Sequence, residues 1–439
     1  MSNSIGIKIK SLRKSLKLTQ SQLAGDEITK SMLSQIENGL AKPSMKTLRY
    51  LSKQLDKPLT YFLEDEINTS SIPIEEINTD LEKVNELIDD DRAYEGVQIL
   101  NNLLSNYSFN KSSKIYADIL YKLGECQMSL EKFDIAKNNL NKSIDIYMSK
   151  NNFLWAAKAY LEFFSVPWTK FDYKKCLTIL NETKKIYKKS INRDFAFEIE
   201  LNYLYSAIYS ALGNTDESFQ FLDKSLKLSN KTKIYFKTDV LYRLLANFYL
   251  LSEDYEGFLL NINKAKQFAD FTDNKRTLYF IEINYAAYYN KIHESYEALK
   301  HLEKSKDYYK PCTFYYIELT KAYYNLEEYL KAYDSIKKSV FDPENAPNKH
   351  RIDYLIIWTG KIYEGLILNK LGKSDKAIDE INYGIRKLEK FGNTANLNFA
   401  YKCLGEVFST KKDFEQAFQA MKKADEIEKN TPPSSRVLL

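Results

Sequence analysis

The sequence predicts an all-α protein, in which an N-terminal domain of five short helices precedes a right-handed superhelical solenoid of about nine helix pairs. The 439 residues include only 13 Gly and 9 Pro, and so few helix breakers favour helices joined by short loops. Hydrophobic residues make up 44% of the chain, which is enough to bury a large core. A motif of small residues recurs after residue 80 and predicts that this part of the chain is built of helical repeats.

An apolar stripe and a capping pattern predict the first two helices. Apolar residues from Ile5 to Leu16 recur at spacings of three and four, which is the period of an α-helix. Thr19 and Gln22 form a capping-box pattern that begins the second helix. Gly25 is expected to end this helix early.

Three further helices complete the domain over residues 1–63. Thr29 is the expected N-cap of the third helix, and Asn38-Gly39 ends it because these residues tolerate a left-handed backbone. Ser44 caps the fourth helix and Pro58 opens the fifth. The residues expected to face the core are Ile5, Ile9, Leu12, Leu16, Leu23, Ala24, Leu33, Ile36, Met45, Leu48, Leu51, Leu55, Leu59, Phe62 and Leu63.

Charge is distributed unevenly along the chain. Residues 1–63 contain 9 Lys and 2 Arg against 4 acidic residues, a net charge of +7, which leaves −2 of the total +5 for residues 64–439. A basic domain favours a polyanionic partner such as nucleic acid, although a solvated lysine-rich surface would have the same composition. The stretch 64–80, which is acidic, contains Ser and Thr and is interrupted by Pro73, is expected to be a linker.

Residues 81–430 contain a repeated pattern. A small residue is followed by a hydrophobic residue four positions later and by a small residue three positions beyond that. The copies are Ala136–Leu140–Ser143, Ser218–Leu222–Ser225, Ala298–Leu302–Ser305, Ala332–Ile336–Ser339, Ala377–Ile381–Gly384 and Ala417–Met421–Ala424, with looser copies at Gly96–Leu100–Leu103, Cys176–Leu180–Thr183 and Phe258–Ile262–Ala265. Upstream of several copies lies a Leu-Gly pair, as in Leu123-Gly124 and Leu404-Gly405.

This is the tetratricopeptide pattern, in which small residues lie where two helices of a hairpin cross closely. Most copies are spaced by more than the usual period of about 34 residues, which lengthens the helices or loops. Such arrays form a concave groove that holds extended peptides or helices. Pro432-Pro433 ends the last helix, and residues 431–439 are expected to be a mobile tail.

The second and third helices have the arrangement of a helix-turn-helix motif. The second helix of such a motif presents short polar or basic side chains at its N-terminal end while its other face anchors in the core. Leu33 and Ile36 anchor here, and the residues expected to face outward are Lys30, Ser31, Ser34 and Gln35, with Met32 at the edge.

The segments "LTQSQLA", "ITKSMLSQIENG" and "KPSMKTLRYLSKQL" resemble the XRE-type helix-turn-helix family over residues 6–63. The resemblance implies that Gln20 contacts a phosphate, that Lys30, Ser31 and Gln35 reach base edges, and that Asn38 and Lys42 contact the next phosphates. The DNA-binding surface it implies comprises Gln20, Ser21, Thr29, Lys30, Ser31, Met32, Ser34, Gln35, Asn38 and Lys42. One departure is that the interval from Leu23 to Leu33 is one residue shorter than usual, with Gly25-Asp26 at the turn.

A shortened XRE head followed by about nine tetratricopeptide-like repeats is similar to the RRNPP quorum-sensing regulators of Gram-positive bacteria, with NprR-like and PlcR-like members closest. This resemblance implies a homodimeric transcription factor that binds palindromic double-stranded DNA and is controlled by a short signalling peptide in the groove. Two alternatives remain open. The repeat domain could instead sequester a response regulator of a phosphorelay, or the protein could be an XRE repressor without peptide control.

Peptide recognition favours particular residue types at inward-facing repeat positions. Asn offers both a donor and an acceptor to a peptide backbone, and Arg suits a C-terminal carboxylate. In the tetratricopeptide register the candidates are Arg243, Asn247, Asn284, Tyr288, Asn290, Tyr324 and Asn325. The alternative is that these are ordinary solvated groove residues.

The sequence contains no pattern typical of an enzyme or a metal site. The four Cys are far apart without a CxxC pair, and the three His show no metal-ligand spacing. No phosphate-binding loop, GxSxG or dinucleotide fingerprint occurs, so neither catalytic residues nor a cofactor are expected. No apolar stretch approaches the roughly 18–20 residues of a membrane span, and no signal peptide begins the chain, so a cytoplasmic protein without a membrane partner is expected.

Overall fold

The computed structural model describes residues 3–16, 18–59, 61–62, 73–339 and 350–431, which are all helix, turn or irregular backbone. The all-α prediction is therefore confirmed. The chain divides into two compact units, Met1–Glu162 and Phe163–Leu439, so the array expected over residues 81–430 extends through both. No helix in the described part of the chain is long and apolar enough to cross a membrane.

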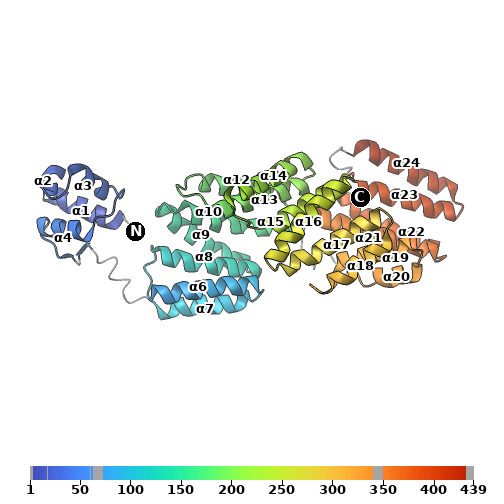
Figure 1. The fold of residues 1–439 in the computed structure, drawn as a ribbon, viewed down its shortest axis with the longest axis horizontal. Coiled ribbons are helices and arrows are strands. Elements are labelled where there is room, and N and C mark those ends of the chain that lie inside the picture. The colour runs from blue at the N-terminus through green and yellow to red at the C-terminus, as the bar shows by residue number, and fades with distance from the viewer. Residues whose placement is uncertain (1–2, 17, 60, 63–72, 340–349, 432–439) are drawn as a thin grey trace. The chain divides into compact units, whose positions relative to one another are not determined.

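The N-terminal domain follows the predicted start and stop signals. Its helices are α1 (Asn3–Ser15), α2 (Gln20–Ala24), α3 (Lys30–Glu37) and α4 (Met45–Gln54) (Figure 1). The capping box at Thr19 is present, and the Thr29 and Ser44 side chains accept hydrogen bonds from the backbones of Met32 and Thr47. Helical backbone resumes after Pro58, and the continuation of the fifth helix beyond Phe62 lies outside the described residues.

The core of this domain contains most of the expected residues, including Ile9, Leu33, Ile36 and Leu51. Leu16 and Met45 were wrongly expected there, since they are 50% and 52% exposed. Leu16 follows the last residue of α1 and Met45 is the first residue of α4, so neither packs between helices.

Gly6 is a close-approach point between α1 and α3 that the apolar pattern did not reveal. A Cβ atom at Gly6 would lie 2.1 Å from the carbonyl oxygen of Ile36. The absence of a side chain therefore lets α1 pack directly on the backbone of α3.

The linker prediction is wrong at its C-terminal end. Helix α6 (Ile74–Asp89) begins after Pro73, which acts as a helix start rather than as a breaker. Ile77 and Val84, two turns apart, are fully buried in the core of the first repeats. Residues 64–72 of the expected linker and residues 432–439 of the expected tail lie outside the described residues, whereas Thr431 is buried.

Consecutive helices form hairpins in both units (Figure 1). The first unit contains α6, α7 (Ala93–Asn106), α8 (Lys114–Ser129), α9 (Phe133–Ser149) and α10 (Phe153–Leu161). From residue 162 onward the elements are η1 (Glu162–Phe164), α11 (Ser165–Thr169), α12 (Tyr173–Tyr187), α13 (Phe195–Ala211), α14 (Thr215–Thr232), α15 (Thr238–Leu251), α16 (Tyr255–Phe271), α17 (Lys275–Lys291), α18 (Ser295–Ser305), α19 (Thr313–Asn325), α20 (Tyr329–Ile336), α21 (Arg351–Lys370), α22 (Ser374–Leu388), η3 (Glu389–Phe391), α23 (Ala395–Thr410) and α24 (Phe414–Asn430).

The repeat motif accounts for the packing within hairpins. Every position of its copies is buried except Met421, which is 45% exposed on the last helix. At Gly124, Gly365 and Gly405 a Cβ atom would lie within 3.0 Å of side-chain atoms of Leu140, Ile381 and Met421 respectively. Small residues therefore mark the helix crossings, as predicted.

A recurring three-residue turn joins many of the helices. Its middle residue has a positive φ, as at Asp91, Glu131, Glu253 and Lys412. The next backbone N–H bonds to a carbonyl five residues earlier, which is the Schellman pattern that ends a helix. Among the described residues, only Gly213 and Gly372 supply glycine at the middle position of these turns.

Candidate DNA-binding helix and repeat-domain groove

The outer face of α3 is polar and exposed, while its inner face anchors in the core. Leu33 and Ile36 are fully buried, and the predicted surface residues Ser21, Thr29, Lys30, Ser31, Met32, Gln35, Asn38 and Lys42 are exposed. Ser34 is half-buried. The helix therefore has the arrangement that a recognition helix requires.

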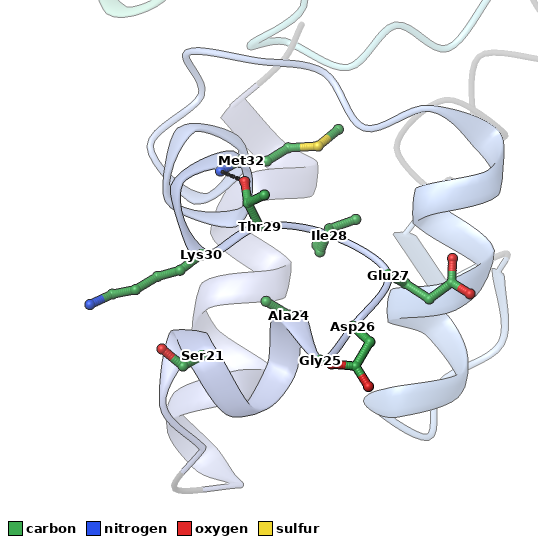
Figure 2. Close-up of a pocket in the computed structure, with 9 residues that line it drawn as sticks. All are labelled: Ser21, Ala24, Gly25, Asp26, Glu27, Ile28, Thr29, Lys30 and Met32. Carbon is green, nitrogen blue, oxygen red and sulfur yellow. Dashed lines mark hydrogen bonds between the residues drawn. The ribbon is translucent and has the colours of Figure 1, made fainter.

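An open hollow of about 480 Å³ lies at the turn between α2 and α3. Figure 2 shows Ser21 and Lys30 on one side of this hollow, with the Lys30 side chain extending outward from the start of α3. The Thr29 hydroxyl caps α3 by accepting the Met32 N–H at 3.1 Å. The Thr29 hydroxyl therefore acts as the N-cap of α3, which is a structural role.

Gly25 makes the shortened turn possible. Its backbone has φ +54 and ψ −145, a conformation that residues with a Cβ atom rarely adopt. A Cβ atom here would also lie 2.2 Å from the Tyr50 hydroxyl oxygen. The early end of α2, predicted from the short interval, is confirmed. The Tyr50 side chain lies directly beside Gly25 at this turn.

A buried carboxylate at the end of α3 ties the helix-turn-helix together. Glu37 is 2% exposed, and it accepts hydrogen bonds from Arg13 at 2.5 and 2.9 Å and from the Gln20 amide at 2.9 Å. Burial alone would raise the pKa of Glu37, but the hydrogen bonds from Arg13 and Gln20 outweigh it and lower that pKa. Gln20, expected to contact phosphate, therefore donates an amide N–H inside the domain.

Arg243 of α15 contacts the neighbouring helix α17. Its Nη1 donates to Asn284 Oδ1 of α17 at 3.4 Å, and its guanidinium lies 5.3 Å from the centre of the Phe280 ring. The Nε of Arg243 and the Oδ1 of Asn247 are buried and have no hydrogen-bond partner among the described residues. Burial lowers the pKa of Arg243, while Tyr203 and Asp353 act in the opposite direction.

The start of α21 approaches helices far from it in sequence. His350 Nε2 donates to the Ala207 carbonyl of α13 at 3.1 Å. Arg351 donates to the carbonyls of Ala211 and Phe391, at 3.4 and 2.7 Å. Asp353, also on α21, and Arg243 are close enough for the charge of each to act on the pKa of the other.

The remaining predicted peptide contacts lie in packed surroundings. Asn290 is buried, and its amide donates to the carbonyl and carboxylate of Glu318, while the Asn325 amide donates to the Asn290 carbonyl at 3.2 Å. Tyr288 stacks on Phe258 at 5.0 Å. These side chains join neighbouring hairpins.

Tyr324 also lies among other rings. It contacts Tyr329 and Tyr363 edge to face, with ring centres 5.7 Å apart in each pair. Its burial raises its pKa, so the phenol stays neutral. The role of Tyr324 as a peptide contact stays a prediction.

The N-terminal domain and the repeats match two different protein families. Residues 9–62 match the Helix-turn-helix family, and residues 117–149 and 199–232 match the Tetratricopeptide repeat family. No curated protein matches the chain significantly.

Three solved structures are similar to most of the chain. The apo form of RapI is 14% identical with a TM-score of 0.55, covering 82% of this chain and 99% of RapI. The apo form of the quorum sensor NprR from B. thuringiensis is 14% identical with a TM-score of 0.54, covering 81% of this chain and 99% of NprR. The Rap conjugation gene regulator of plasmid pLS20, solved with the Phr* peptide, is 13% identical with a TM-score of 0.50, covering 80% and 95% of the two chains.

The chain combines a helix-turn-helix domain with tetratricopeptide repeats, as predicted for a protein resembling the RRNPP family, and shares its fold with RapI and NprR. The predicted resemblance is confirmed at that level. The structure also places Phe280 beside Arg243 and brings Arg351 at the start of α21 to α13 and η3, and the sequence predicted neither contact. The only sequence signal for Arg351 and its neighbours is the charged cluster "HRID" at the start of α21, which the repeat motif does not contain.

Proposed function

We propose that the chain is a homodimeric DNA-binding regulator whose repeat domain binds a short signalling peptide. The observation that carries the DNA-binding part is the exposed polar face of α3 in a domain of net charge +7, anchored by Leu33 and Ile36. Two such heads would read half-sites about 34–36 Å apart, or a multiple of that distance. Lys30 and Gln35 are the residues proposed for direct base contact, with G and A respectively.

Replacing Lys30 with alanine is expected to weaken binding to the preferred operator by about 1–3 kcal/mol and to relax its sequence preference. The operator would first be selected from random duplexes by the wild-type protein, and affinities then measured by fluorescence anisotropy at fixed salt. Lys46→Ala is the matched control, because Lys46 is exposed on α4 and pairs with the exposed Glu27 at 3.7 Å. Unchanged affinity and preference in Lys30→Ala would refute the assignment of α3 as the reading helix.

Peptide binding is proposed for the surroundings of Arg243 and Asn247 on α15. Its support is the pair formed by the Arg243 Nε and the Asn247 Oδ1, which offer a donor and an acceptor one turn apart on α15 and bond to no described residue. The likeness in fold to a Rap protein solved with a peptide is consistent with peptide binding by this chain. A binding role of this kind requires neither a cofactor nor catalytic residues.

Helix α24 supports the proposed dimer. Phe414, Phe418 and Met421 follow one another at helical spacing and are 67%, 65% and 45% exposed. Terminal repeats normally present a polar outer face, so an apolar stripe on the last helix favours an interface.

Phe418→Glu is therefore expected to convert the dimer to a monomer, as measured by sedimentation velocity of the full chain. Tyr296→Glu is the control, since Tyr296 is similarly exposed on α18 but outside this stripe. A dimer that persists unchanged in Phe418→Glu would exclude this face. The response-regulator partner and the peptide-independent repressor stay predictions, and a pull-down with residues 64–439 would distinguish them.

A further inference from the structure

Helix α21 has an additional turn at its N-terminal end. Gly365 of α21, Gly124 of α8 and Gly405 of α23 lie at equivalent close crossings within their hairpins. Helix α21 begins 14 residues before its glycine, whereas α8 and α23 begin 10 residues before theirs. The four extra residues make about one turn of helix, which α8 and α23 lack.

This turn packs against segments that precede it by more than 130 positions. The ring of Trp168 in α11 lies 5.6 Å from the ring of His350, and Phe171 meets Tyr354 edge to face with ring centres 4.7 Å apart. Phe171 also packs against the core formed by α21, α22 and α23. Three whole hairpins, α15–α16, α17–α18 and α19–α20, lie between the two segments in sequence. The contact is therefore additional to the stacking of neighbouring hairpins.

Arg351 binds the C-terminal ends of two helices at once. Its guanidinium donates to the carbonyl oxygens of Ala211 at 3.4 Å and Phe391 at 2.7 Å, which belong to the last residues of α13 and η3. The last carbonyl groups of a helix have no partner within the helix, and at the end of α13 they carry the negative end of the helix dipole. A cation is favourable there, so one side chain joins helices of different hairpins.

His350 makes a second connection between α13 and α21. Its Nδ1 accepts the Ile352 N–H at 3.1 Å, which caps α21, and its Nε2 donates to the Ala207 carbonyl at 3.1 Å. Burial lowers the pKa of His350 to about 4, so the imidazole is neutral near pH 7. One neutral tautomer, with the proton on Nε2, makes both hydrogen bonds.

We propose that residues 350–354 form a strap that ties α21 to α11 and α13 and so fixes the curvature of the hairpins between them. In an array held only by contacts between neighbours, each hairpin is coupled to the adjacent ones alone. The strap couples α13 directly to α21, and these helices separate only when the bonds of Arg351 and His350 break. A partner that spreads the intervening hairpins must release the strap, and a partner that draws them together strengthens it.

Arg351→Met tests the strap in the full chain without any ligand, because it keeps a long side chain but removes every donor. Hydrogen exchange, read by mass spectrometry, is expected to rise at least about tenfold at the end of α13, residues 205–212, as well as at the start of α21. Exchange in α17 and α18 should stay as in the wild type. Arg351→Lys keeps the charge and a donor, so it should restore part of the protection.

Arg386→Met is the matched control, since Arg386 carries the same charge on the exposed face of α22 and should leave α13 unaffected. Trp168→Leu tests the contact from its other side and should raise exchange at residues 350–354. This variant decides the question if Arg351→Met unfolds every helix from α13 to α24. An increase confined to α20, α21, α22 and η3 in Arg351→Met, or unchanged exchange at residues 350–354 in Trp168→Leu, would overturn the strap.

Discussion

Arg13→Ala is expected to unfold the N-terminal domain and abolish DNA binding, while the repeat hairpins remain folded. The substitution leaves the Glu37 carboxylate, which is 2% exposed, without its main partner. Breaking a buried ion pair by removing one partner typically costs about 3–5 kcal/mol, which is comparable to the whole stability of a domain this small. Hydrogen exchange of the full chain, read by mass spectrometry, would show lost protection in α1 to α4 and unchanged protection in α13 to α24.

Two controls separate the ion pair from a general loss of charge. Lys10→Ala removes a cation from the same helix whose Nζ bonds to the exposed Asn38 at 3.0 Å, so it should have little effect. Adding Glu37→Gln to Arg13→Ala removes the unpaired charge and should restore part of the protection. If Arg13→Ala retained full protection and DNA affinity, the network would not stabilise the head.

The same network gives an acid sensitivity to the head. The folded-state pKa of Glu37 is lowered, so its contribution to stability is complete above the ordinary glutamate pKa of about 4.3. The contribution is lost as the pH falls through the folded-state pKa. The charge on Glu37 therefore stabilises the domain throughout the neutral range.

Gly25→Ala should have the second largest effect, because it combines backbone strain with a collision. The positive φ costs about 1–3 kcal/mol for a residue with a side chain, and the new Cβ would lie 2.2 Å from the Tyr50 hydroxyl. Local hydrogen exchange in α2 and α3 should increase, and affinity for the selected operator should fall because the reading helix is no longer held in place.

Tyr50→Phe distinguishes the two causes. The double variant Gly25→Ala/Tyr50→Phe lacks the hydroxyl, so it should regain the share of hydrogen-exchange protection that the collision removes. Gly392→Ala provides the strain alone, since Gly392 has φ +76 and no atom of the described residues lies within 4 Å of the added Cβ. Protection equal to that of the wild type in Gly25→Ala would mean that the turn tolerates a side chain.

The local signals of the head were readable from the sequence because they depend on short-range physics. Thr19, Thr29 and Ser44 cap their helices through residues three positions away. The contacts that hold the head together, between Arg13 and Glu37 and between Gly6 and Ile36, join residues at least 24 positions apart. No periodicity encodes such contacts.

The surroundings of Arg243 were predicted less completely for the same reason. The repeat register placed Arg243 and Asn284 on the first helices of successive hairpins, and the two side chains do form a hydrogen bond. It did not predict the position of the start of α21, where His350 and Arg351 contact α13 and η3. Pro73 was misread because a proline that interrupts a polar stretch and one that begins a helix differ only in the residues after them, here the buried Ile77.

The three-residue turns between helices allow the sequence of such a chain to change widely without loss of the fold. Their hydrogen bonds run between backbone groups, and Asp, Glu, Lys and Asn occupy the middle position at several of them in place of Gly. The repeat is thus defined by a few buried small residues and by main-chain geometry, neither of which demands a particular surface sequence. Most hairpins can therefore drift until only residues 117–149 and 199–232 still match a family pattern, while the architecture remains the same.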